Sequence, residues 1–197
     1  MSFLVMSVQG DGIMKLEKAT RILGSEKKAR RAYSMSINRV GRKGFTKVKR
    51  VVAKQVKLTQ KKVVQYGNVK QNFAHSAKLE HRITSRGGEV PLKEFRARET
   101  KRGVVANPMG KRQLFEHTFI KSGWWPTRHG PVGNGHVFSP DLSTNKAGRA
   151  FKRTRSGVSI PIQIVEDQSK AAFNANAKAL PIEINKMIRK MTGGVVS

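Results

Sequence analysis

Apolar residues recur at helical spacing near the beginning of the chain. In residues 12–23 (GIMKLEKATRIL) they stand three or four positions apart, at Ile13, Leu16, Ala19 and Leu23. Gly24 follows directly, at the position where a glycine commonly ends a helix. The pattern predicts a short amphipathic helix that ends at Gly24.

A longer pattern of the same period follows this helix. Ser25 is a capping residue type, and Glu26 suits the first turn of a helix. One face then carries small and apolar side chains: Ala29, Tyr33, Ser36, Ile37, Val40, Gly44, Val48 and Val51. The spacing predicts a helix over residues 26–56, roughly 45 Å long. Two internal glycines, Gly41 and Gly44, each cost it about 1 kcal/mol relative to alanine, so we expect a neighbouring element to support it.

The period of the pattern changes beyond residue 56. Thr59 can cap a short helix that runs from Gln60 to Tyr66 and ends at Gly67–Asn68. In residues 77–86 (AKLEHRITSR), apolar and polar positions alternate instead. This alternation predicts a half-buried strand with His81 on its inner side.

Further strands are expected after the Gly87–Gly88 turn signal. Residues 90–95 are expected to return as the partner of strand 77–86, at an edge of the sheet because of Pro91. Residues 104–106 and 113–120 read as additional strands around turn residues. An antiparallel sheet in the middle of the chain follows.

The last third of the chain begins with an irregular segment. Residues 121–155 are rich in Gly, Pro, Asn and basic residues, which predicts a flexible or partner-ordered loop. Residues 158–165 alternate and predict a last edge strand. A C-terminal helix, kinked or restarted at Pro181, is expected from Phe173, Ala177, Leu180, Ile184, Ile188 and Met191. Residues 1–197 are thus predicted to form a single α+β domain with a long N-terminal basic helix, a central antiparallel sheet and a C-terminal helix.

The charge of the chain adds a functional constraint to this fold. Its 40 Lys and Arg residues against 12 Asp and Glu residues give a net charge of +28. Self-repulsion on this scale opposes compaction unless a polyanion or an acidic neighbour compensates it. Nucleic acid is therefore the first partner to consider, beside the simpler possibility of a solvated basic surface.

The long predicted helix concentrates this charge. Residues 26–56 contain eleven basic residues and one acid, Glu26. Seven of the basic residues project together, opposite the apolar face: Lys28, Arg31, Arg39, Arg42, Lys43, Lys49 and Arg50. Like charges three or four positions apart destabilise an isolated helix, so this row makes sense mainly opposite an anion. We predict that it binds nucleic acid or an acidic protein surface.

The residue types needed for catalysis are scattered or missing. The chain has no cysteine, and the only adjacent carboxylates, Glu166 and Asp167, are explained by helix capping. Two histidine pairs, His75 with His81 and His129 with His136, match no established metal-ligand spacing. No phosphate-binding glycine motif or serine nucleophile motif is present. We expect a protein that is not an enzyme and that has no metal site and no cofactor.

Two further features concern partners and location. Trp124–Trp125 can stack on bases near Arg128, but a tryptophan pair more often anchors a protein partner, which is the interpretation we favour. The apolar opening MSFLVMSVQGDG lacks a preceding basic region and is too short for a signal peptide. No stretch has about 18 consecutive apolar residues, so we expect no membrane partner and synthesis in the cytoplasm.

The order of these features resembles the phage minor tail protein Z family, the tail-completion proteins of long-tailed, lambda-like phages. The resembling segments span nearly the whole chain: MKLEKATRIL (14–23), SINRVGRKGFTKVKRVVAKQVKLTQKKV (36–63), AKLEHRITSRGGEVPLKEF (77–95), GKRQLFEHTFI (110–120) and ALPIEINKMIRKM (179–191).

The resemblance implies a component of the virion tail, assembled in the host cytoplasm, that completes the head-proximal end of the tail for joining to the head. It also implies a ring-forming homo-oligomer, contact with other tail and neck proteins, and contact with double-stranded DNA at the genome end. A ring of very basic subunits around a DNA path would have a lumen of the required sign. The alternative is a general basic nucleic-acid-binding protein, such as a ribosomal or nucleoid component.

Overall fold

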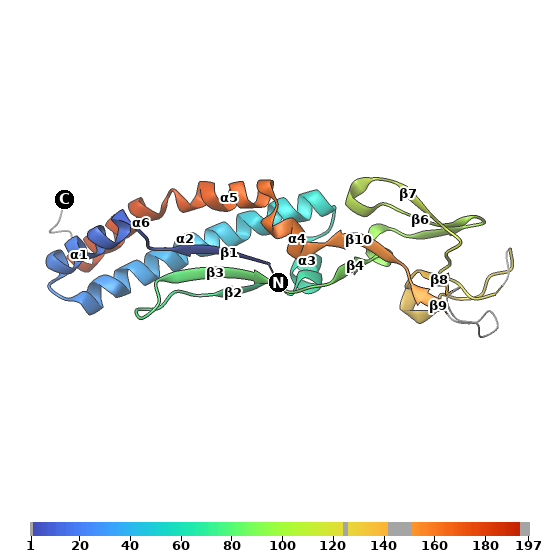
Figure 1. The fold of residues 1–197 in the computed structure, drawn as a ribbon, viewed down its shortest axis with the longest axis horizontal. Helices are drawn as coiled ribbons and strands as arrows, with labels where there is room; N and C mark the ends of the chain where they lie inside the picture. The colour runs from blue at the N-terminus through green and yellow to red at the C-terminus, as the bar shows by residue number, and fades with distance from the viewer. Residues whose placement is uncertain (1, 124–125, 142–150, 194–197) are drawn as a thin grey trace.

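The computed structural model describes residues 2–123, 126–141 and 151–193. The molecule is elongated, with long helices towards one end and short strands towards the other (Figure 1). We call residues 2–88 and 160–193 the helical half, and the described residues of 89–159 the β-rich half. Long helices, antiparallel sheets and a C-terminal helix confirm the predicted α+β fold.

The first two helices agree with the sequence pattern. Helix α1 spans Asp11–Leu23, and Gly24 ends it in the left-handed conformation with a φ of 64°. Helix α2 spans Glu26–Val56, as predicted, and Lys57 ends it with a φ of 55°. At a rise of 1.5 Å per residue, α2 is about 46 Å long.

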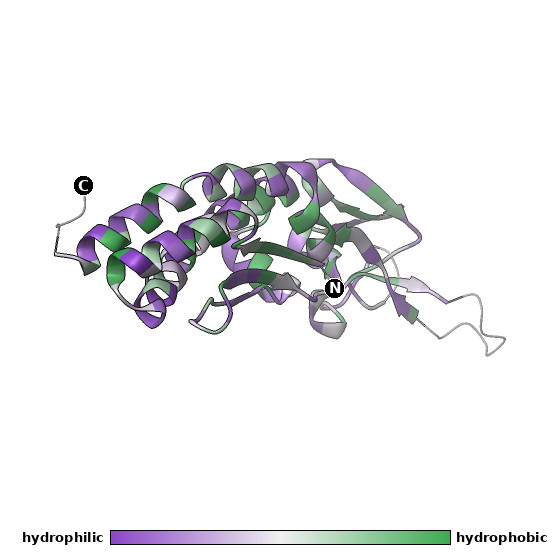
Figure 2. Ribbon diagram, turned by 60° about the vertical axis from the view of Figure 1, so that its left-hand side comes forward, coloured by the Kyte–Doolittle hydropathy of each residue, from purple (hydrophilic) through white to green (hydrophobic). Residues whose placement is uncertain are grey.

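Helix α2 is the central element of the core. Its predicted apolar face is buried except for Val51, which is half-buried. The neighbouring residue, Val52, is fully buried instead. Hydrophilic residues interrupt hydrophobic ones at short intervals along the helices (Figure 2), as expected where one face is buried. The buried residues of α2 are Ala29, Ala32, Tyr33, Ser34, Ser36, Ile37, Val40, Gly41, Gly44, Val48, Val52 and Val56.

Both glycines of α2 are points of close approach. A Cβ atom on Gly41 would lie 2.5 Å from Cγ of His81, and one on Gly44 would lie 3.3 Å from the ring of Phe173. The two neighbours, His81 and Phe173, are about 90 residues apart in the sequence and pack on different sides of the helix. The neighbouring elements expected to support α2 are therefore present. They approach the helix this closely because Gly41 and Gly44 have no side chain.

The C-terminal segment covers α2 as two helices. Helices α5 (Asp167–Ala177) and α6 (Leu180–Met191) both contact α2, and Pro181 lies in the first turn of α6. The predicted restart at Pro181 is confirmed; a proline fits the first helical turn because its nitrogen needs no acceptor there. Nδ2 of Asn176 donates a hydrogen bond to the Val40 carbonyl oxygen over 2.7 Å, which fixes α5 against α2.

A three-stranded antiparallel sheet packs on another side of α2. Its central strand is β3 (Glu80–Ser85), flanked by β1 (Ser2–Ser7) and β2 (Lys70–Asn72). The sequence pattern correctly placed His81 and Ile83 inside, and both are fully buried. It did not predict β1, because six residues at the beginning of the chain gain their strand conformation from pairing with β3, about 80 residues away.

The predicted return strand after Gly87–Gly88 is wrong. Helix α3 (Gln60–Gly67), capped by Thr59 as predicted, holds the chain at this point. The Arg86 amide donates to the Gly67 carbonyl over 3.0 Å, so the backbone passes along α3 and does not turn back on β3. Residues 92–95 form the 3-10 helix η1 (Leu92–Phe95) instead.

The β-rich half consists of small antiparallel sheets. The order β5-β6-β7 makes the largest of them, and two pairs, β4 with β10 and β8 with β9, complete the half. Two 3-10 turns, η2 (Pro108–Gly110) and η3 (Gly133–Gly135), connect strands. The strands are β4 (Glu89–Pro91), β5 (Arg98–Thr100), β6 (Gly103–Ala106), β7 (Gln113–Glu116), β8 (Phe138–Pro140), β9 (Phe151–Arg153) and β10 (Arg155–Ser159).

Two sequence predictions in this region need correction. The segment 121–155, predicted to be an irregular loop, contains η3, β8, β9 and the first residue of β10 among its described residues. The strand predicted over 158–165 stops at Ser159, and Ile160–Val165 form helix α4. In α4, Ile160 and Ile164 are one helical turn apart and both buried, a spacing that the alternating pattern concealed.

Candidate nucleic-acid interface

The seven basic residues predicted on α2 lie on its exposed side. Six of the seven are exposed and Lys49 is half-buried. They occupy an arc of about 120°, which is the part of the helix surface that the buried residues leave open. We call this set the basic strip: Lys28, Arg31, Arg39, Arg42, Lys43, Lys49 and Arg50.

The strip has the length of a short segment of duplex. From Lys28 to Arg50 it extends about 33 Å along the helix axis. One turn of B-form DNA rises about 34–36 Å and carries a phosphate charge about every 1.7 Å. Several cations of the strip can therefore face phosphates at the same time.

Carboxylates compensate the strip at one place. Nη1 of Arg39 lies 2.8 Å from Oε1 of Glu183, and Glu183 is buried whereas the Arg39 side chain is 60% exposed. In the described part of the chain, no other strip residue has a carboxylate oxygen within 4 Å. The remaining positive charge is left to solvent or to a partner.

Aromatic rings orient two of the cations. The guanidinium of Arg42 lies 5.0 Å from the centre of the Phe73 ring, and Nζ of Lys49 lies 4.6 Å from that of Phe45. Such cation–π contacts are worth about 0.5–1 kcal/mol at exposed sites. Arg42 also adds to the effect of burial on His81, and together they lower the pKa of that imidazole.

The strip lies on a rigid support. On one side, the Asn38 side chain makes two 2.7 Å hydrogen bonds to the backbone of Ala74, which hold the β2–β3 connection against the helix. On the other side, Ser36 donates to the Glu183 carbonyl over 3.3 Å. Because neighbours hold α2 on both sides, a partner would meet cations whose backbone is already fixed.

Among the described residues, His81, Glu166 and Asp167 do not belong to the strip. His81 is buried, and Trp124 and Trp125 lie outside the described residues. Glu166 stands at the N-cap position of α5 but makes no side-chain capping hydrogen bond, so the expected capping is not observed there; it accepts a hydrogen bond from Gln163, and Asp167 lies in the first turn of α5. No cluster of three or more His, Asp or Glu side chains that could hold a metal ion occurs among the residues described.

One group of residues escaped the sequence analysis. Phe119, Phe138 and Phe151 meet in the β-rich half beside an ion pair between Glu99 and Arg128. No periodic pattern links these residues, because they come from separate short strands and connections. A sequence signal for the group is therefore lacking.

The comparisons with known proteins give no information on this interface. No helix of the described residues is long and apolar enough to cross a membrane. Comparisons of the chain with protein-family models, with curated proteins and with solved structures each returned no match.

Proposed function

We propose that this chain acts by binding and not by catalysis, as a structural and assembly protein whose basic strip contacts double-stranded DNA. The observation that carries the proposal is the strip itself, a row of cations on a supported helix with a single carboxylate partner, Glu183, among the described residues. A surface of this kind binds the phosphate backbone without reading sequence.

The resemblance to the phage minor tail protein Z family supports a more specific role. In this proposal the chain is a virion protein that completes the head-proximal end of the tail for head–tail joining. It would form a homo-oligomeric ring that contacts other tail and neck proteins. The basic strips of its subunits would face the genome end. A general nucleic-acid-binding protein remains the alternative, and detection of the chain in purified virions separates the two.

The strip can be tested with a double variant that leaves the fold intact. Lys43 and Arg50 are exposed, and replacing both with Gln should reduce the magnitude of the negative salt slope of duplex binding, d log K/d log[salt], by about 2. Titrations of labelled duplexes of different sequence at several salt concentrations measure this slope. Affinity should fall about equally for all sequences, because phosphate contacts carry no base information.

A matched control removes the same charge elsewhere. Lys15 and Lys18 are exposed residues of α1, which packs on α2 through the apolar cluster that contains Ala29 and Tyr33. Replacing Lys15 and Lys18 with Gln should reduce the magnitude of the salt slope by less than the Lys43→Gln/Arg50→Gln variant does. Equal slopes for both variants would mean that only net charge matters, and would contradict a DNA-binding role of the strip.

The same variants distinguish DNA from an acidic protein surface. If the strip binds a protein ring, the Lys43→Gln/Arg50→Gln variant keeps its affinity for DNA, while tails fail to complete or to join heads. Mass measurement in the presence of tail tube proteins should also show a closed oligomer. A compact monomer that never associates with tail proteins would count against the tail role and leave the DNA test standing.

A further inference from the structure

The β-rich half contains a cavity with its own chemistry. Its volume is about 520 Å³, within the range of about 300–1,000 Å³ that is usual for small-ligand sites. Three phenylalanines and a valine supply the apolar lining, and the connection after Phe119 supplies the polar part. The lining residues are Phe119, Lys121, Ser122, Gly123, Arg128, Val132, Phe138 and Phe151.

The aromatic rings of the cavity form a contiguous group. Phe119 is stacked on Phe138, with ring centres 6.1 Å apart and an angle of 29° between the planes. Phe151 meets Phe119 edge to face, with ring centres 5.0 Å apart. Phe151 is nevertheless 54% exposed, so part of its ring remains available to a ligand.

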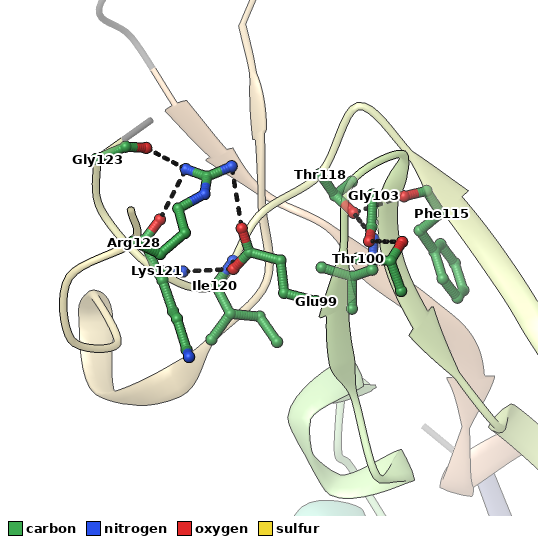
Figure 3. A network of polar contacts seen from close by, with 10 residues as sticks. Glu99, Thr100, Gly103, Phe115, Thr118, Ile120, Lys121, Gly123 and Arg128 are labelled. Carbon is green, nitrogen blue, oxygen red and sulfur yellow. Dashed lines mark hydrogen bonds and ion pairs between the residues drawn. The ribbon is translucent and has the colours of Figure 1, made fainter. Parts of the chain in front are cut away.

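An ion pair holds one wall of the cavity in place (Figure 3). Oε2 of Glu99 accepts hydrogen bonds from the amides of Ile120 and Lys121, over 2.9 and 2.8 Å. Nη2 of Arg128 lies 3.0 Å from Oε1 of Glu99, and Nη1 donates to the carbonyl oxygens of Lys121 and Gly123. These contacts tie the wall to β5, so a ligand would not have to order it.

The charge at the cavity favours an anionic ligand. Lys121 lines the cavity and is exposed, and none of the described lining residues is a carboxylate. Arg153, also exposed, lies two positions after Phe151 in β9, so the two residues share one face of that strand. Glu99, the carboxylate next to this wall, is only 5% exposed and is paired with Arg128.

We propose that this aromatic cavity binds an unstacked base of single-stranded nucleic acid, with Lys121 and Arg153 facing the adjoining phosphates. Aromatic rings beside cations are the usual means of binding single strands without sequence preference. A duplex keeps its bases stacked and cannot fill the cavity. The inference rests on the proposed function only in taking nucleic acid as the ligand class, because the basic strip lies on α2 in the other half of the molecule.

The test compares single-stranded and duplex ligands on the full chain. We expect Phe151→Ala to weaken binding of a labelled 12-nucleotide oligo-dT by about 5- to 150-fold, the equivalent of losing one stacked base. Binding of a duplex should change less than twofold. Fluorescence anisotropy at fixed salt measures both affinities.

Two further variants serve as controls. Phe3→Ala removes a similarly exposed phenylalanine, 51% against 54%, from β1 in the helical half, and should leave oligo-dT binding unchanged. Phe151→Tyr keeps an aromatic ring and should retain most of the affinity.

Two outcomes would overturn the inference. One is unchanged oligo-dT binding by Phe151→Ala, and if that variant also loses tail joining, the cavity is assigned to a protein partner. The other is an equal loss of affinity for oligo-dT and for the duplex. None of these results bears on the Lys43→Gln/Arg50→Gln test, so failure of the cavity and failure of the strip are distinguishable.

Discussion

The two halves of the molecule are stabilised in different ways. In the helical half, the 31 residues of α2 serve as one long support, and its neighbours pack apolar side chains or close backbone against it. In the β-rich half, strands of three to five residues and their connections add a few buried side chains, among them Val90, Phe95 and Val104, to the same apolar core, and polar side chains tie the connections. Thr118, for example, accepts from the Val104 amide over 3.1 Å and donates to the Phe115 carbonyl over 2.6 Å.

This difference determines where charge is free. Carboxylates of the β-rich half are paired within the protein: Glu99 pairs with Arg128 in the same half, and Glu94 contacts Tyr66 and Lys62 of α3 at 2.5 Å. Helix α2 has eleven cations but a single acid of its own, Glu26, which pairs with Arg30. Helix α2 therefore presents a continuous row of cations to a partner, whereas the carboxylates of the β-rich half fix connections and its exposed cations, such as Lys121 and Arg153, belong to separate short strands and connections.

The largest expected effect comes from removing the central ion pair of the β-rich half. Glu99→Ala leaves the Arg128 guanidinium without its carboxylate partner and two backbone amides without their acceptor, and should destabilise this half by about 2–4 kcal/mol. We place the value below that of a fully buried pair because Arg128 is 23% exposed. Hydrogen exchange followed segment by segment should show faster exchange in 98–140 and little change in α2.

Its control is an exposed ion pair of the same half. Arg102 and Glu116 are 3.7 Å apart and are 80% and 59% exposed, so Glu116→Ala should cost less than about 1 kcal/mol. Faster exchange in α2 of the Glu99→Ala variant would show that the two halves unfold as one cooperative unit, which would remove the distinction between them.

A smaller effect is expected from the glycines of α2. Gly41→Ala places a methyl group 2.5 Å from the His81 ring, and should destabilise the protein by about 1–2 kcal/mol after the gain in helix propensity is counted. At Gly44 the nearest atoms are 3.3 Å away, so Gly44→Ala should be close to neutral. Urea unfolding monitored by circular dichroism measures both. Equal effects of the two substitutions would contradict the view that β3 approaches α2 more closely than α5 does.

The smallest expected effect is a dependence on pH. Burial, with a contribution from Arg42, lowers the pKa of His81, and burial with Lys93 and Arg153 lowers that of His136. In the folded state both imidazoles thus take up a proton at a lower pH than in the unfolded chain, where histidine titrates near pH 6.5. The free energy of unfolding should therefore be independent of these two histidines above about pH 6.5 and should decrease as the pH falls below it.

Substitution assigns this pH dependence to one half or the other. His81→Gln should reduce the loss of stability on acidification in the helical half, and His136→Gln should do so in the β-rich half. Unfolding curves recorded between pH 7.5 and pH 5 provide the measurement. A free energy of unfolding that increases on acidification of the wild type would contradict the lowered pKa of both histidines.

The sequence by itself determined the features that depend on local period and on residue type. Spacing and residue type within single helices predict four such features: the bounds of α2, the end of α1 at Gly24, the restart at Pro181 and the basic strip. Such features need no knowledge of distant neighbours, because a helix satisfies its own backbone hydrogen bonds.

Only the tertiary structure decided the features that join distant segments. The pairing of β1 with β3, the contacts of Gly41 and Gly44, and the group of Phe119, Phe138 and Phe151 each bring together residues far apart in the chain. Short strands leave their backbone groups to be satisfied by partners that no local pattern identifies. For this reason the basic strip was visible in the sequence, whereas the aromatic cavity of the β-rich half was not.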